Sequence, residues 1–90
     1  MSLDNIEQMK DNLYDIILSL KTREDCREFF ADLCTNKEIE QMAQRIRAAE
    51  LLKEGKTYAQ VSEELEISSA TLARVSREMQ YGKGYKKFIK

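Results

Sequence analysis

The chain has 90 residues, no proline and only three glycines. A chain of this length makes one small domain and buries only about two-thirds of its unfolded surface, so a lone monomer would be marginally stable. Long stretches of helix-forming residues without proline predict an all-α fold of about five or six short helices. Histidine is absent, and Cys26 and Cys34 are not spaced like zinc ligands, which argues against a metal site.

The formal net charge of −1 is unevenly distributed along the chain. Residues 1–34 contain four basic and eight acidic side chains, residues 35–68 contain five and seven, and residues 69–90 contain six and one. The C-terminal segment therefore has a net charge of +5. A basic face can contact phosphates while an acidic remainder stays away from them, although a solvated basic tail would have the same composition.

Two further features concern the cellular location. The longest apolar run, Ile16-Ile17-Leu18, is too short to cross a membrane, and no signal peptide precedes the domain, so we expect a cytoplasmic protein. Cys26 and Cys34 lie among apolar residues of one predicted helix, and we expect both to be buried, reduced thiols.

The N-terminal third predicts two amphipathic helices. Apolar side chains at three- and four-residue steps indicate a first helix from about Asp4 to Leu20. Thr22 is expected to cap the next helix, because acidic residues follow it and favour the positive end of a helix. The expected buried face of this second helix consists of Cys26, Phe29, Phe30, Leu33 and Cys34.

A third helix is predicted to begin at about Asn36, because Thr35 and Glu38 form a capping box. Gly55 suits the left-handed cap at its end. Its apolar stripe consists of Ile39, Met42, Ala43, Ile46, Ala49 and Leu52. The apolar stripes of residues 1–54 exceed what two more short helices can cover, so we expect this part to form the core and the interface of a twofold homodimer. A compact monomeric bundle is the alternative.

Residues 57–79 are typical of a helix-turn-helix. Thr57 and Gln60 form a second capping box, which starts a fourth helix. Residues 66–68 form the junction, where Ile67 is expected to fill the core and Ser68 to cap the fifth helix. Glu66 stands where such junctions often have glycine, and because glutamate tolerates positive φ poorly, we expect a slightly different turn.

The fifth helix has the pattern of a recognition helix. At about 100° per residue, Leu72, Val75 and Met79 face inward, and Ala70, Arg74, Arg77 and Tyr81 face outward. Small residues at the start allow close approach to base edges, and arginines can grip phosphates or read guanine, two roles that stay open here. The DNA-binding candidates are Gln60, Ser68, Ser69, Ala70, Thr71, Ala73, Arg74 and Arg77.

Residues 80–90 form a basic tail with interleaved aromatic and apolar residues. Its lysines could contact phosphates without sequence preference. Alternatively, Phe88 and Ile89 pack back on the helices and leave the lysines in solvent.

A resemblance to a known family begins at residue 35, with the stretch Thr35-Asn-Lys-Glu-Ile-Glu-Gln-Met-Ala-Gln-Arg-Ile-Arg47. Further matches are Glu50, Leu52, Gly55, Leu65 and the run Ala70-Thr71-Leu72-Ala73-Arg74. The chain resembles the tryptophan-repressor-like proteins (Trp repressor superfamily) over residues 35–79, about half of its length. The resemblance implies an all-helical, intertwined dimer that binds operator DNA.

The same resemblance implies an effector site. Positions that contact the ligand in tryptophan-responsive members match Thr35, Arg45 and Arg74, and all three residue types are retained. The glycine that follows the second arginine in the family pattern is Val75 here, and a β-branched side chain there would fill the space for an indole ring. We therefore expect a different effector, or none, in place of tryptophan.

Together, these patterns predict a sequence-specific regulator of transcription that binds double-stranded DNA and needs no cofactor. The alternative is a helical protein-interaction module whose basic face docks an acidic partner. An enzyme is disfavoured, because the chain has no histidine, no cysteine beside a base and no glycine-rich phosphate loop.

Overall fold

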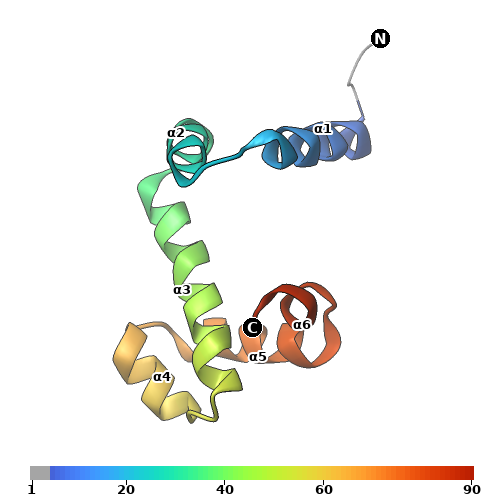
Figure 1. The fold of residues 1–90 in the computed structure, drawn as a ribbon. Coiled ribbons are helices and arrows are strands. Elements are labelled where there is room, and N and C mark those ends of the chain that lie inside the picture. The colour runs from blue at the N-terminus through green and yellow to red at the C-terminus, as the bar shows by residue number, and fades with distance from the viewer. Residues whose placement is uncertain (1–4) are drawn as a thin grey trace. The chain divides into compact units, whose positions relative to one another are not determined.

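The computed structural model describes residues 5–90, which form six helices and no strand. The helices are α1 (Ile6–Ser19), α2 (Arg23–Leu33), α3 (Asn36–Lys53), α4 (Tyr58–Leu65), α5 (Ser69–Tyr81) and α6 (Gly84–Phe88) (Figure 1). The predicted all-α fold is confirmed. The helices belong to two compact units, residues 1–35 and 36–90, and each unit is described by itself. No helix among residues 5–90 is long and apolar enough to cross a membrane.

Helix α1 begins where a side chain satisfies its first free N–H groups. The Asn5 side chain accepts a hydrogen bond from the Gln8 N–H at 2.8 Å. The predicted start at Asp4 lies outside the described residues. The helix ends at Ser19, one residue before the predicted Leu20.

Helix α2 has the predicted cap. The Thr22 hydroxyl accepts from the Asp25 N–H, and the Asp25 carboxylate accepts from the Lys21 N–H, both at 3.0 Å. The hydrogen bond from Lys21 favours the ionised carboxylate and therefore lowers the pKa of Asp25 below its ordinary value.

Neither helix of the first unit contains a buried residue. The predicted buried face of α2 was wrong for Cys26 and Leu33, which are exposed, whereas Phe29, Phe30 and Cys34 are half-buried. The expectation of two buried thiols was therefore wrong for Cys26. Both thiols are free. The physical reason is that two short helices have no second layer within their own unit to cover their apolar faces.

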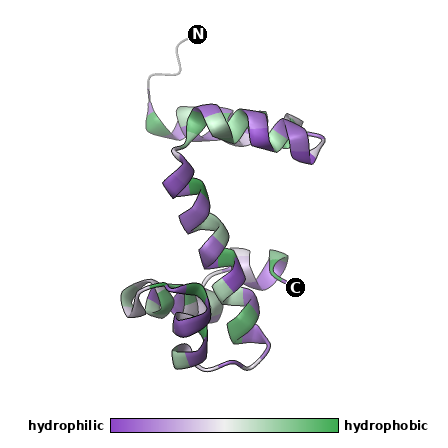
Figure 2. Cartoon of the chain, turned by 90° about the vertical axis from the view of Figure 1, so that its left-hand side faces the viewer, coloured by the Kyte–Doolittle hydropathy of each residue, from purple (hydrophilic) through white to green (hydrophobic). Residues whose placement is uncertain are grey.

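The second unit has a small, fully apolar core. Its largest fully buried side chains are Leu51 from α3, Val61 from α4, and Leu72 and Val75 from α5. Ala48 and Ala49 are completely buried on α3, as expected where helices approach closely. Figure 2 shows hydrophilic and hydrophobic residues alternating along α3. The sequence pattern had omitted Leu51 from the apolar stripe of this helix.

Gly55 ends α3 in the predicted left-handed conformation, with φ of 98°. The Lys56 N–H donates to the Leu51 carbonyl at 3.1 Å, and the Gly55 N–H donates to the Leu52 carbonyl at 3.0 Å. These two bonds form a Schellman motif and satisfy carbonyl groups that the helix itself leaves free.

The basic tail forms helix α6, which is anchored on the core. Tyr85 and Ile89 pack against the buried cluster. The Lys53 ammonium group donates to the Ile89 carbonyl at 3.0 Å. Phe88, in contrast, is 70% exposed. Of the two alternatives for the tail, the one in which both apolar residues pack back therefore holds for Ile89 and fails for Phe88.

Candidate nucleic-acid interface

Helix α4, the first helix of the helix-turn-helix, starts with the predicted capping box. The Thr57 hydroxyl accepts from the Gln60 N–H at 3.2 Å, and the Gln60 side-chain oxygen accepts from the Thr57 N–H at 2.9 Å. Gln60 is exposed, so its amide NH₂ group faces solvent while its oxygen serves the cap. Gln60 can therefore still donate hydrogen bonds to DNA from its NH₂ group, whereas its side-chain oxygen already accepts a hydrogen bond within the cap.

The junction between α4 and α5 turns at Glu66. This residue has φ of 54° and ψ of 40°, the left-handed conformation that glycine adopts most easily. Ser62 donates from its hydroxyl to the Ile67 carbonyl at 3.0 Å, across the turn. Ile67 is buried in the core, as predicted. The expectation of a different turn was therefore wrong: Glu66 adopts the left-handed backbone conformation of a glycine-containing turn and bears the steric cost of its Cβ atom.

The two faces of α5 are divided as the sequence predicts. Leu72 and Val75 are 1% exposed and Met79 packs against the core. The exposed residues on the other face are Ser69, Ala70, Ala73, Arg74, Arg77 and Tyr81. A shallow groove of about 420 Å³ runs along this face, lined by Ala70, Ala73, Arg74, Arg77 and Glu78. The inward face fixes the orientation of the helix, and the outward face presents small residues first and guanidinium groups one turn later.

The first turn of α5 keeps one hydroxyl group ready to donate. The Ser68 hydroxyl accepts from the Thr71 N–H at 3.2 Å and donates to the Thr71 hydroxyl at 3.0 Å. The proton of Ser68 is therefore engaged within the cap. Thr71 accepts this bond, so its own hydroxyl proton can point to a base edge or a phosphate.

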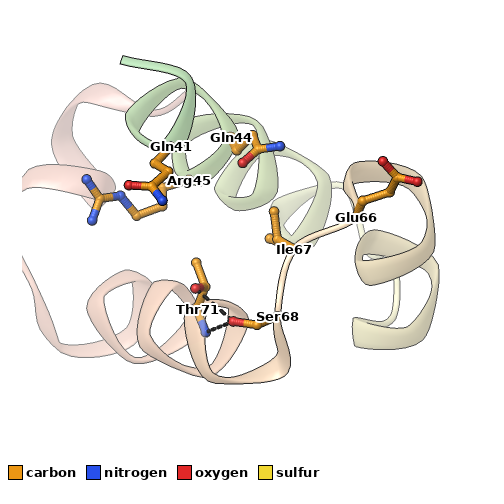
Figure 3. Close-up of a pocket in the computed structure, with 7 residues that line it drawn as sticks. All are labelled: Gln41, Gln44, Arg45, Glu66, Ile67, Ser68 and Thr71. Atoms are coloured by element: carbon orange, nitrogen blue, oxygen red, sulfur yellow. Dashed lines mark hydrogen bonds between the residues drawn. The ribbon is translucent and has the colours of Figure 1, made fainter. Parts of the chain in front are cut away.

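A polar pocket of about 340 Å³ adjoins this turn (Figure 3). Gln41, Gln44 and Arg45 of α3 line one side, and Ser68 and Thr71 line the other. Sequence patterns missed Gln41 and Gln44 as part of this site, because polar side chains on a largely apolar helix look like ordinary solvated residues. No signal in the sequence would have distinguished them.

A second pocket, of about 400 Å³, lies between α3, α5 and α6. Its lining includes Arg45 and Arg74, so the structure brings together two of the three predicted effector residues. Val75 also lines this pocket but is 1% exposed, because its side chain belongs to the core. Thr35 is the last residue of the first unit, and its role stays a prediction.

A metal centre finds no support in the part of the chain that the structure describes. Residues 5–90 contain no group of three or more Cys, Asp or Glu side chains arranged to hold an ion. The outward face of α5 carries hydrogen-bond donors and positive charge, a combination that suits the binding of an anionic polymer.

Comparisons with known proteins give the same picture of the fold. The sequence model of the family described as Trp repressor protein matches residues 8–90. Among curated proteins, YerC of Bacillus subtilis (strain 168), which has no assigned activity, is 45% identical over 83 residues, covering 91% of this chain and 80% of that protein.

Two crystal structures resemble the chain closely. One, from Staphylococcus aureus, is described as a candidate Trp repressor; it is 43% identical with a TM-score of 0.84, covering 90% of this chain and 81% of that one. The other is a TrpR-like protein from Eubacterium eligens, 38% identical with a TM-score of 0.86, covering 94% of this chain and 87% of that one.

Proposed function

Because this chain belongs to the Trp repressor family of helix-turn-helix DNA-binding regulators, we propose that it is a sequence-specific, repressor-like regulator of transcription. Its ligand is double-stranded DNA, and it acts as a homodimer. The observation that carries the proposal is the outward face of α5, where small residues at the first turn precede the exposed side chains of Arg74 and Arg77.

This arrangement supports DNA binding through two kinds of contact. Ser69, Ala70 and Thr71 are small enough to let the start of α5 approach base edges in a major groove, where they can specify the sequence. Arg74 and Arg77 supply charge for phosphates or bidentate contacts to guanine. Phosphate contacts would provide most of the affinity and its dependence on salt.

The proposed homodimer is supported by the apolar residues that the first unit leaves uncovered. Ile6 is 60% exposed, Leu18 is 81% exposed and Leu33 is 51% exposed. A second copy is the partner that closes such surfaces by twofold symmetry. Two recognition helices related by a dyad would then read a near-palindromic site whose half-sites are about one helical turn, roughly 34 Å, apart.

The proposed effector differs from tryptophan or is absent. Support comes from Val75, whose buried side chain occupies the position where the family pattern has glycine. Thr35, Arg45 and Arg74 remain the candidate ligand contacts. A cytoplasmic location remains a prediction as well.

Selection from a random double-stranded DNA library at near-physiological salt, followed by sequencing, tests the proposed function. We expect enrichment of a dyad-symmetric motif. Affinity for that motif should fall in the double variant Arg74→Ala/Arg77→Ala. The matched control is Arg23→Ala/Arg27→Ala, which removes the same charge from exposed positions of the acidic first unit.

Failure of the library to yield any motif, with or without tryptophan, would contradict sequence-specific binding by the free protein. Weak binding without base preference would instead favour the alternative function, a helical module that docks an acidic partner. Equal affinities of the two double variants would show that the outward face of α5 is the wrong surface.

A further inference from the structure

A small pocket lies where α6 packs against the ends of α3 and α5. Its volume is about 280 Å³, and five residues line it: Lys53, Met79, Tyr85, Lys86 and Ile89. Lys53 is the last residue of α3, and Met79 lies in the last turn of α5. Tyr85 and Lys86 belong to α6, and Ile89 follows it. The pocket therefore belongs entirely to the second unit.

The inner lining of this pocket is apolar. The side chains of Met79, Tyr85 and Ile89 pack against the buried core, and all three are half-buried. A thioether and an aromatic ring both make favourable contacts with another aromatic ring. This part of the lining therefore suits the apolar body of a ligand, and an aromatic one in particular.

Two ammonium groups without a carboxylate partner complete the lining. Lys53 and Lys86 are exposed, and no Asp or Glu among residues 5–90 lines the pocket. The Lys53 ammonium group donates to the Ile89 carbonyl at 3.0 Å, which leaves two of its three N–H donors. Lys86 makes no hydrogen bond or ion pair with residues 5–90. The pocket thus offers donors and positive charge to an anion.

The acidic residues closest to Lys53 in the sequence are engaged elsewhere. Glu50 and Glu54 pair with the guanidinium group of Arg47, at 3.2 and 3.8 Å. These carboxylates are therefore drawn to another cation, and the charge of Lys53 has no counterion from its own helix.

We propose that this pocket binds a small organic anion, an aromatic ring joined by a short chain to a carboxylate. The ring contacts Met79 and Tyr85, and the carboxylate accepts charge-assisted hydrogen bonds from the two lysines. The site differs from the pocket of the candidate effector contacts Arg45 and Arg74, which shares only Tyr85 with it. The inference goes beyond the proposed function and does not depend on DNA binding.

The volume of the pocket limits the size of the ligand. An apolar cavity of about 150 Å³ holds benzene, so by proportion a pocket of about 280 Å³ holds about 11 non-hydrogen atoms. That is the size of 3-phenylpropionate. A free amino acid suits the site less well, because its ammonium group would lie near two other cations.

The test titrates 3-phenylpropionate into the full 90-residue chain. The uncharged control ligand is 3-phenylpropanamide, which has the same ring and the same chain. Methionine methyl groups labelled with ¹³C report the place of binding by nuclear magnetic resonance, and Met79→Leu assigns the signal of Met79. Met79 lines the pocket, whereas Met9 and Met42 lie outside its lining and serve as internal references.

We expect a saturable shift of the Met79 methyl signal, with a dissociation constant of roughly 0.1–1 mM for so small a ligand in an open site. The signals of Met9 and Met42 should stay unchanged. The amide should bind at least about tenfold more weakly than the carboxylate, because it carries no charge for the two ammonium groups.

A pair of matched double variants tests the role of the lysines. Lys53→Gln/Lys86→Gln should weaken binding of the carboxylate by about threefold for each lost ammonium group, or roughly tenfold in all, and leave binding of the amide unchanged. Lys86→Gln alone breaks no bond within residues 5–90 and should cost about threefold. The control, Lys37→Gln/Lys56→Gln, removes the same charge from exposed positions outside the lining and should keep the wild-type affinity. Circular dichroism checks that the helical content of each variant is unchanged.

Four results would overturn the inference. The first is that the Met79 signal shows no saturable shift at millimolar ligand, and the second is that carboxylate and amide bind equally well. The third is an equal loss of affinity in the two double variants, which would mean that only overall charge matters. The fourth is that Arg74→Gln weakens binding while Lys53→Gln/Lys86→Gln does not, which would move the anion to the neighbouring pocket. Because the titrations contain no DNA, their failure and the failure of the proposed function are separate results.

Discussion

The side-chain amide of Gln44 on α3 donates a hydrogen bond to the carbonyl oxygen of Leu65, the last residue of α4, with a nitrogen–oxygen distance of 3.3 Å. Carbonyl groups in the last turn of a helix have no partner within that helix. This contact therefore satisfies one of them and ties the long helix to the junction that orients the recognition helix.

Replacing Gln44 by alanine should lower the free energy of unfolding by about 1 kcal/mol, the typical net value of such a bond. For a domain of this size, the melting temperature should fall by roughly 4–8 °C. The control is Gln41→Ala, an exposed position one turn earlier on the same helix. Thermal unfolding that shifts equally in both variants would rule out a specific role for the Gln44 bond.

Glu66 should be replaceable by glycine with a gain in stability. The left-handed backbone conformation of Glu66 costs an L-residue roughly 1–2 kcal/mol that glycine would not incur. Glycine also makes the unfolded chain more flexible, and this effect offsets part of the gain. We therefore expect Glu66→Gly to raise the free energy of unfolding by about 0.5–1 kcal/mol.

Glu66→Gln separates the backbone effect from the charge effect, because it removes the carboxylate and keeps the strained conformation. Chemical denaturation measures stability, and DNA titration measures affinity. If Glu66→Gln stabilises the protein as much as Glu66→Gly does, the destabilising effect of Glu66 comes from its charge and not from its backbone conformation.

Tryptophan should not bind to the wild-type protein at micromolar concentrations. Val75 is packed in the core, and its side chain takes the place of the family's glycine at the wall of the pocket that Arg45 and Arg74 also line. The chain contains no tryptophan, so the added amino acid is the only indole emitter in solution. A saturable change in its fluorescence would contradict this prediction.

Val75→Ala is the companion variant. Deleting two methyl groups from a fully buried side chain should lower the free energy of unfolding by about 1–3 kcal/mol. If the β-branched side chain alone blocks the pocket, this variant should change the emission of tryptophan while the wild type does not.

The stability of the protein should depend on its concentration. If a second copy covers the apolar faces of α1 and α2, association stabilises the folded chain by mass action. The melting temperature should therefore rise as the concentration is raised from about 1 to 100 μM, and sedimentation should give twice the monomer mass. Replacing Leu18 by glutamate should abolish this dependence, whereas the same change at the exposed, polar Gln80 should preserve it.

Local patterns in the sequence determined the helices and the two faces of the recognition helix. The caps at Thr22, Thr57 and Ser68 depend on side chains that accept from backbone N–H groups three residues away, so the sequence predicts them without a tertiary structure. The division of α5 into a buried face and an exposed face likewise follows from its 3.6-residue period.

Only the tertiary structure decided which apolar faces are covered and which distant residues meet. Cys26 and Leu33 have the period of a buried face yet are exposed, because periodicity predicts that a face needs a partner and does not say whether the same chain supplies it. The hydrogen bond between Gln44 and Leu65, and the place of Arg45 and Arg74 in the lining of one pocket, depend on helix packing between segments far apart in the sequence. Such contacts produce no periodic pattern in the sequence, because they depend on the shapes of the side chains that pack together.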